Sequence, residues 1–200
     1  MEAQAKTIVT DINELDPNGV YTYADYLTWR FDEYVELLRG RLRRMSPAPK
    51  RRHQDISGNI FSEIKSFLRR KRCKVYIAPF DVRLPKKGSN EIYTVIQPDV
   101  CIICDPKKLD EAGCLGTPDT IIEVLSKGNV DRDINEKFAL YEESGVPEYW
   151  IVSPGEKTVT CYLLNAEGQY KLSGEYADPR LIPVASLPEY KIQWEDSFEE

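Results

Sequence analysis

Apolar positions along the chain follow two spacings, and each spacing predicts a different kind of element. Between residues 53 and 70, Ile56, Ile60 and Ile64 recur at intervals of four residues, which predicts a helix with one apolar face. A similar spacing predicts a helix over residues 131–144, closed by a glycine. Shorter runs rich in β-branched residues predict strands between and around these helices.

The strands are expected over residues 41–45, 74–84, 93–104, 120–125, 148–152, 157–164 and 170–172. The pairs at 74–104 and 157–172 surround turn residues and are predicted to form hairpins. A short helix is expected from Tyr21, capped by Thr22, and Tyr34 to Leu38 is expected to form a second short helix or turn. This order predicts an α/β (α+β-like) fold with one mixed central sheet and helices on both faces.

The length of 200 residues suits one domain. We assign it to residues 21–187, preceded by a flexible arm over residues 1–20 and followed by an acidic tail over residues 188–200. No apolar run approaches the ~20 residues that cross a bilayer, and the first residues lack the apolar segment of a secretory signal. Five cysteines without framework spacing suit a reducing compartment, so we expect a cytoplasmic protein with unpaired cysteines.

Charge changes this picture, because the net charge of −6 is distributed unevenly. Thirteen Lys and Arg residues but only two acidic residues fall between residues 39 and 74. Such an asymmetry indicates a surface that binds a polyanion, although a solvated surface explains the charge alone equally well. The side chains expected to contact nucleic acid are Arg41, Arg43, Arg51, Arg52, His53, Arg69, Arg70 and Arg72.

Two carboxylates interrupt strands that would otherwise be apolar. Asp99 follows Pro98, which places it at a strand start or bend, and Glu123 lies in the middle of an apolar run. An isolated buried carboxylate costs several kcal/mol unless a partner compensates it. If the two strands are neighbours, both carboxylates reach one point, and such oxygen donors suit Mg²⁺. Asp99 taken alone could equally cap a turn.

These residues belong to a longer ordered series. It comprises Tyr34-Val-Glu-Leu-Leu-Arg-Gly40, Met45-Ser-Pro47, His53-Gln54, Phe80-Asp-Val-Arg-Leu84, Gln97-Pro-Asp-Val100, Ile122-Glu-Val-Leu-Ser126, Lys137-Phe-Ala-Leu-Tyr141 and Gly145-Val-Pro-Glu-Tyr-Trp-Ile-Val152. The series resembles the PD-(D/E)XK nuclease superfamily, and more closely its Uma-type branch of restriction-endonuclease-like proteins. The likeness spans roughly residues 21–187.

The resemblance implies a restriction-endonuclease-like core that hydrolyses phosphodiester bonds of DNA with Mg²⁺ or Mn²⁺. Asp99 and Glu123 would bind the metal, and Glu36, on a leading helix, would lie at the edge of the site. The resemblance also suggests that His53 lies near the site and contacts phosphate, although an ordinary residue at the start of a helix explains it equally well. Asp81 lies on the strand face opposite Phe80 and Val82, and from that position it is expected to support the metal or pair with Arg83. By analogy with the superfamily, a homodimer is also expected.

The chain departs from the superfamily pattern at one position. The superfamily has a lysine two residues after the glutamate, and this chain has Leu125 there. The resemblance moves the lysine to the next helix, as Lys137, which flanks the face that packs on the sheet. Lys127, in a turn beside Gly128, is the rival. Because Leu125 breaks the motif, a catalytically inactive fold that binds nucleic acid, or a module that binds an acidic protein, remains the alternative.

Cys101 and Cys104 have the spacing of a metal-binding or redox pair. They lie in a predicted strand without a second such pair or a nearby histidine, so we interpret them as buried small side chains.

Overall fold

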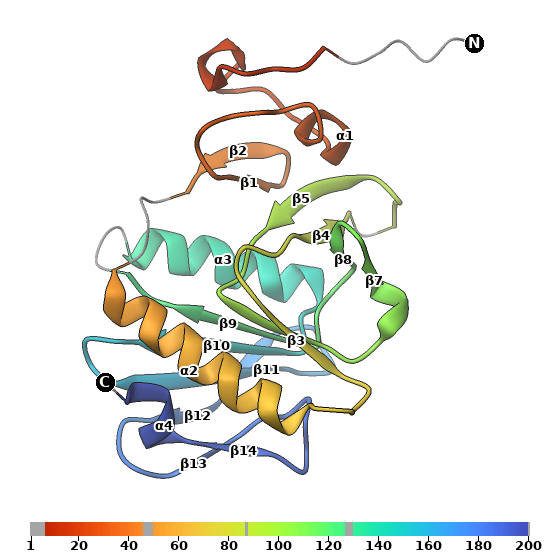
Figure 1. Cartoon of the computed structure of the whole chain (residues 1–200). Helices are drawn as coiled ribbons and strands as arrows, with labels where there is room; N and C mark the ends of the chain where they lie inside the picture. Colours follow the sequence, from red (N-terminus) through yellow and green to blue (C-terminus); the bar gives the residue numbers. More distant parts are fainter. Residues whose placement is uncertain (1–6, 46–49, 87, 127–129, 200) are drawn as a thin grey trace.

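The computed structural model describes residues 7–45, 50–86, 88–126 and 130–199, with only the backbone of residues 130–133. Within these ranges, two six-stranded sheets, one two-stranded sheet and four α-helices form the fold (Figure 1). The helices are α1 (Tyr23–Tyr26), α2 (Arg51–Phe67), α3 (Val130–Ser144) and α4 (Trp194–Phe198). The mixed α and β fold is as predicted, but a single central sheet is not. No helix in the described residues is long and apolar enough to cross a membrane.

The upper sheet, named for its place in Figure 1, combines antiparallel pairs with one parallel pair, β4 and β8. In spatial order its strands are β2 (Arg41–Arg44), β1 (Val35–Leu38), β5 (Ile92–Ile96), β4 (Val82–Pro85), β8 (Gly113–Leu115) and β7 (Leu109–Asp110). The turn between β1 and β2 has positive φ at both Arg39 and Gly40, which is the geometry of a two-residue hairpin. Residues 35–38 are therefore a strand, and the predicted short helix or turn there is wrong.

The lower sheet carries the longer strands. Its order is β12 (Tyr170–Tyr176), β11 (Thr158–Leu164), β10 (Glu148–Ser153), β9 (Thr120–Val124), β6 (Val100–Ile103) and β3 (Lys74–Ile77). The central β9 pairs in parallel with β10 and antiparallel with β6. It is buried on both faces, as its uninterrupted apolar run predicted.

Helices cover the two faces of the lower sheet. Ile56 and Ile60 of α2 are buried in one cluster with Ile122 of β9. On the opposite face, Tyr141 of α3 is buried in a second cluster with Ile121. Figure 1 shows α3 lying between the two sheets. Side chains of β9 therefore alternate between the α2 face and the α3 face.

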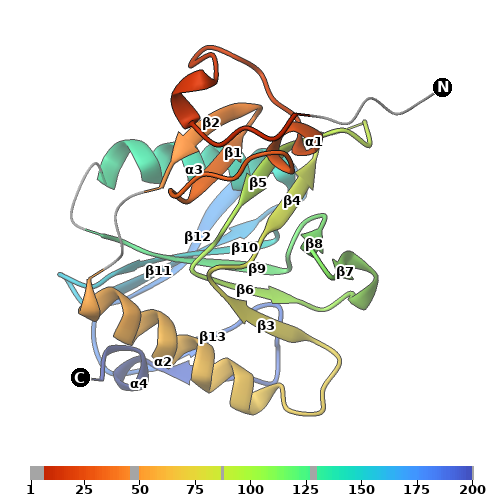
Figure 2. The same ribbon diagram turned by 45° about the horizontal axis from the view of Figure 1, so that its top comes forward.

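The hairpin predicted over residues 74–104 is divided between the two sheets. β3 pairs with β6 in the lower sheet, whereas β4 pairs with β5 in the upper sheet. Both strands change sheet at the same level, through residues 78–81 and 97–99 (Figure 2). Proline interrupts each strand there, and it cannot donate to a strand ladder. The split hairpin, residues 74–103, therefore places residues 81, 97 and 99 at the junction of the sheets.

Both ends of the described chain pack on this core. Val9 forms a β-bridge with Trp29 and packs against the apolar cluster that contains Trp29 and Val35, so this part of the predicted arm is attached to the protein beside β1. At the other end, β14 (Lys191–Gln193) pairs with β13 (Leu181–Pro183), and Phe198 of α4 is buried against the α2 cluster. The described part of the acidic tail is thus integral to the core.

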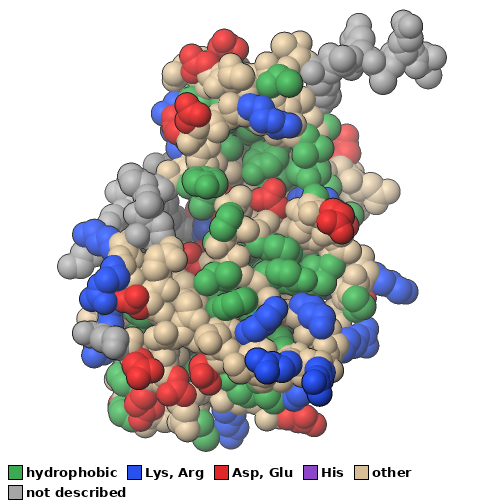
Figure 3. Space-filling model, in the orientation of Figure 1, with side chains coloured by type: hydrophobic (Ala, Val, Ile, Leu, Met, Phe, Trp, Pro, Cys, Tyr) green, Lys and Arg blue, Asp and Glu red, His purple; other side chains and the backbone are tan. Residues whose placement is uncertain are grey.

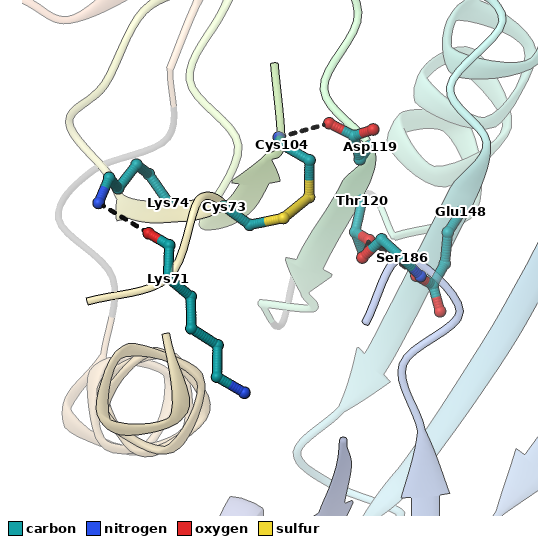
Figure 4. The surroundings of a disulfide bond; sticks show 8 residues. All are labelled: Lys71, Cys73, Lys74, Cys104, Asp119, Thr120, Glu148 and Ser186. Carbon is teal, nitrogen blue, oxygen red and sulfur yellow. Dashed lines mark hydrogen bonds between the residues drawn. A yellow bond between two sulfur atoms is a disulfide. The ribbon is translucent and has the colours of Figure 1, made fainter. Parts of the chain in front are cut away.

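A disulfide links Cys73 to Cys104, at the ends of β3 and β6 (Figure 4). The register that pairs Lys74 with Ile103 brings these two residues opposite one another. The expectation that all cysteines are unpaired is therefore wrong for this pair. The free cysteines among the described residues, Cys101, Cys114 and Cys161, are buried.

Candidate active site

Glu123 points from β9 toward α3. Its Oε1 accepts hydrogen bonds from Lys137 Nζ at 2.9 Å and from the Tyr141 hydroxyl at 2.5 Å. Both donors belong to α3 and are four residues apart, so they lie on the same face of the helix. Only 8% of the surface of Glu123 is exposed. The structure therefore places Lys137 beside the motif glutamate, although it follows Glu123 by fourteen residues.

Asp99 precedes β6 at the split in the hairpin. Val100 is opposite Ile122 in the β6–β9 register, so Asp99 reaches the level of Glu123. Its Oδ2 accepts a hydrogen bond of 2.7 Å from the backbone N–H of Val124. The two carboxylates predicted to share a point are thus on neighbouring strands and interact electrostatically.

The upper sheet contributes Glu36, which lies on β1 and not on a leading helix as predicted. Its Oε1 lies 3.6 Å from Lys137 Nζ and accepts a 2.9 Å hydrogen bond from the backbone N–H of Gln97. The hairpin turn after β1 explains the correction, because it fixes residues 35–38 as a paired strand. Lys137 therefore bridges a carboxylate from each sheet.

Charge and burial set the protonation of this cluster. Burial raises the pKa of Glu123 above its usual range; Lys137 opposes the shift, whereas Asp99 and Glu36 add to it. Burial alone would lower the pKa of Lys137, but the attraction of Glu123 and Glu36 outweighs it and raises that pKa. Lys137 consequently stays an ammonium and serves as a donor of hydrogen bonds and positive charge.

His53 approaches the site from the first turn of α2. Its Nε2 lies 3.2 Å from Asp99 Oδ2, and only 8% of its surface is exposed. Burial lowers the pKa of His53, but the contact with Asp99 more than offsets this and raises it overall. The histidine therefore holds one oxygen of Asp99, together with the Val124 N–H.

Each of the two carboxylates makes its contacts through one oxygen. In the described part of the chain, no hydrogen bond reaches Asp99 Oδ1 or Glu123 Oε2, since all their contacts are made by the other oxygen. No three His, Cys, Asp or Glu side chains form a preformed metal cluster among these residues. Any cation held here would rely on two carboxylates supplemented by backbone or water oxygens.

The predicted basic residues do not form one continuous surface. Arg51, Arg52 and His53 begin α2, whereas Arg69 and Arg70 follow its other end, about 25 Å away at 1.5 Å per residue. Residues 69–72 therefore lie beyond the end of α2.

Several of the other predicted contacts are engaged within the protein. Arg43 pairs with Glu136 of α3 at 2.7 Å, and Arg51 pairs with Asp55. Arg41 donates to the backbone carbonyl of Asn18.

Two further predictions have different outcomes. Lys127, the rival of Lys137, lies outside the described residues. Arg83 pairs with Asp110, so the ion pair considered between Asp81 and Arg83 is not formed. Asp81 instead accepts a 2.8 Å hydrogen bond from the side chain of Gln97, and burial raises its pKa.

Sequence reasoning did not assign roles to Tyr141 and Gln97. Tyr141 ends the quoted motif that begins at Lys137, and its position four residues after that lysine is the signal that both reach one partner. Gln97 belonged to the quoted motif, but its backbone contact with Glu36 depends on β1 lying beside β5, which the sequence pattern does not reveal.

Two comparisons with known proteins find a match. One solved structure, "a putative nuclease belonging to DUF820" from Anabaena variabilis ATCC 29413, matches with a TM-score of 0.70 and 21% identity, covering 88% of this chain and 97% of that chain. At this identity the match shows a shared fold. No curated protein matches the sequence. Residues 23–195 match the Uma2 family, described as "Putative restriction endonuclease". The chain therefore belongs to the Uma2 family.

Proposed function

We propose that this protein is a metal-dependent endonuclease that hydrolyses phosphodiester bonds of DNA. The observation that carries the proposal is the pairing of Asp99 and Glu123 on neighbouring strands, each with one oxygen turned away from its protein partners. The Uma2 family carries the description "Putative restriction endonuclease" and the similar Anabaena protein the description "putative nuclease", which supports the same reaction class.

The donor chemistry at these residues fits Mg²⁺ or Mn²⁺. Carboxylate oxygens that accept no hydrogen bond within the described structure are hard ligands, and Mg²⁺ commonly takes one or two carboxylates and completes its shell with water. Asp99 and Glu123 would hold the cation. It would supply Lewis-acid activation of a water nucleophile and neutralise charge on the phosphate.

The chain's own residues have distinct tasks in this reaction. Lys137, kept protonated by Glu123 and Glu36, donates hydrogen bonds to the attacking water or to the oxygens that gain charge. Tyr141 and His53 fix the second oxygens of Glu123 and Asp99, which orients the free ones. Lys137 thus takes the place that Leu125 leaves open in the superfamily pattern.

Nicking of supercoiled plasmid by the purified protein tests the proposal. We expect nicking with Mg²⁺ or Mn²⁺, none with EDTA, and loss of activity in Asp99→Ala and Glu123→Ala. Glu156→Ala, which changes an exposed carboxylate, is the matched control. Nicking that persists in EDTA, or active-site variants as active as the wild type, would contradict the assignment.

The alternative is a nuclease fold that binds nucleic acid without cutting it, and Leu125 is the observation that favours it. It predicts DNA binding by the wild type, with no metal-dependent nicking and no effect of Asp99→Ala on binding. Retained binding without cleavage would select this alternative.

A further inference from the structure

A concave site lies next to the carboxylate cluster, because Gln97 lines it and also holds Glu36. It is a cleft of about 440 Å³, within the range of small-ligand sites, between the end of β3, the bend after it and the turn that joins β7 to β8. Its walls are formed by Tyr76, Pro79, Phe80, Asp81, Gln97 and residues 110–113. None of these side chains contacts Lys137 or Glu123 in the hydrogen bonds described above.

Two aromatic rings form one wall of this cleft. Tyr76 and Phe80 stack with ring centroids 4.1 Å apart and planes within 9° of parallel. Both side chains are half-buried, so part of the pair faces solvent. A planar ligand can extend such a stack, and stacking on aromatic side chains is the general way proteins hold unpaired bases.

The polar lining selects against anions. Asp81 and Glu111 contribute carboxylates, whereas the carboxylate of Asp110 is paired with Arg83, so a phosphate group would meet repulsion from the first two inside the cleft. Gln97 donates its side-chain amide to Asp81, which gives the cleft an amide and a carboxyl group side by side. Burial also raises the pKa of Asp81. These groups suit a neutral heteroaromatic ring with its own donors and acceptors.

Gln97 connects this cleft to the carboxylate cluster. Its backbone N–H holds Glu36, which lies 3.6 Å from Lys137, while its side chain lines the cleft. Gln97 is therefore shared by the cleft and the carboxylate cluster, and the two sites are adjacent. A base in the cleft would belong to a nucleotide close to the phosphate at Asp99 and Glu123.

Positive charge lies across β3 from the cleft. A second cavity of about 290 Å³ is lined by Lys65, Arg69, Arg70 and Lys74 together with Leu68 and Val75. Leu68 and Val75 belong to the cluster on the α2 face of the sheet, whereas Tyr76 and Phe80 pack with the cluster on the α3 face. Figure 3 shows hydrophobic side chains gathered on this face, with Lys and Arg side chains beside them. This cluster attracts phosphates and repels a cationic peptide.

We propose that the cleft at Tyr76, Phe80 and Gln97 binds an unpaired nucleobase of the nucleic acid at the neighbouring carboxylate site, which makes the protein selective for strands with a base out of the duplex. The inference rests on the proposed function, since it assigns a feature of the substrate. The base stacks on the Tyr76–Phe80 pair. Because β3 is the edge strand of the lower sheet, the flanking nucleic-acid strand passes around that edge and its phosphates approach the basic cavity at Lys74.

Fluorescence titration in EDTA tests this without cleavage. The probe is a DNA duplex with one unpaired 2-aminopurine, compared with the same duplex fully paired. We expect the wild type to bind the unpaired probe more tightly and to quench its fluorescence. Phe80→Ala should weaken this binding about tenfold, which is within the range for one base–aromatic stack. Gln97→Leu, which retains the backbone N–H that holds Glu36, should weaken it severalfold.

Tyr190→Ala is the matched control, because it removes one half-buried ring from a similar stacked pair, Phe67 and Tyr190, outside the cleft. It should bind the unpaired probe like the wild type. If Phe80→Ala does not fold, Gln97→Leu and the preference for the unpaired probe still decide the question. Equal binding of both duplexes, or no effect of either cleft variant, would overturn the proposal.

An arginine-rich peptide provides a second arm. If Phe80→Ala weakens binding of the peptide but not of DNA, the cleft holds a cationic chain and the proposal is overturned. These experiments distinguish failure of the cleft proposal from failure of the proposed nuclease function. Base binding without plasmid nicking supports the cleft and contradicts hydrolysis, whereas metal-dependent nicking with no role for Phe80 or Gln97 overturns the cleft alone.

Discussion

Glu123 and Glu148 are both buried in the lower sheet, on the neighbouring parallel strands β9 and β10. The two oxygens of Glu148 accept four hydrogen bonds from uncharged donors: Thr120 Oγ1, Trp150 Nε1 and the backbone N–H groups of Ala185 and Ser186. Glu123 uses only one oxygen within the described structure, toward Lys137 and Tyr141.

The comparison shows what separates a structural carboxylate from a candidate catalytic one. Glu148 is saturated, so it fastens the segment at Ala185 to the sheet and has nothing left to bind. Glu123 has a free oxygen in the described structure and other carboxylates nearby, which a folded protein tolerates where a cation or substrate compensates them. Burial alone does not distinguish the two.

The largest effect is expected at the charge partner of Glu123. Lys137→Ala removes the ammonium that contacts both Glu123 and Glu36, and should lower the rate of plasmid nicking by about a hundredfold to a thousandfold. Lys137→Arg should retain part of the activity. Lys127→Ala is tested beside it. If Lys127→Ala abolishes nicking while Lys137→Ala does not, the assignment of Lys137 as the active-site lysine is wrong.

A stability change of about 3 kcal/mol is expected at the other carboxylate. Glu148→Ala leaves the buried Trp150 N–H without its acceptor and removes the acceptor of the Ala185 and Ser186 N–H groups, so the free energy of unfolding should fall by that amount. Urea denaturation measures it. The nicking rate of the folded variant should match that of the wild type. A loss of nicking in a variant that is still folded would contradict a purely structural role for Glu148.

A smaller effect is expected at the hydroxyl that holds Glu123. Tyr141→Phe removes one hydrogen bond to a carboxylate and should lower the free energy of unfolding by about 1.5 kcal/mol. Nicking should decrease but persist, since Lys137 remains. Tyr149→Phe is the control, because no hydrogen bond of its hydroxyl is found in the described residues. If Tyr141→Phe and Tyr149→Phe change stability and nicking equally, the Tyr141 hydroxyl does not position Glu123.

The smallest effect per residue is expected far from both carboxylates. Replacing Arg69, Arg70 and Arg72 by Gln should weaken DNA binding and reduce the slope of log affinity against log salt by up to about 3. Arg43→Gln should change the slope less, because Arg43 already pairs with Glu136. Filter binding at several salt concentrations measures both. An unchanged slope in the triple variant would remove this cluster from the DNA surface.

Much of the lower region was predictable because local patterns determine it. The apolar stripe of α2 and the uninterrupted run of β9 identified both elements, and the carboxylate in that run identified Glu123. The helix spacing around Lys137 was also correct. These features depend on residues close together in the sequence.

The missed features depend on contacts that no local pattern records. Glu36 was placed on a helix because the hairpin turn at Arg39 was not recognised. The predicted pairing of the two long strands in residues 74–104 was correct. Their division between two sheets was not predicted, because it depends on the pairing of β4 with β8. Glu148 resembled an ordinary strand residue, since its partners at Ala185 and Ser186 are distant in sequence.

The split hairpin also couples the folding of the two sheets. Its halves are continuous strands, so separating β4 from β5 releases Gln97, and separating β3 from β6 releases Asp99. Neither sheet is complete without a chain segment that starts in the other. We therefore expect the two sheets to unfold as one cooperative unit, since the described residues contain no boundary between them at which the chain could be cut into independently folding parts.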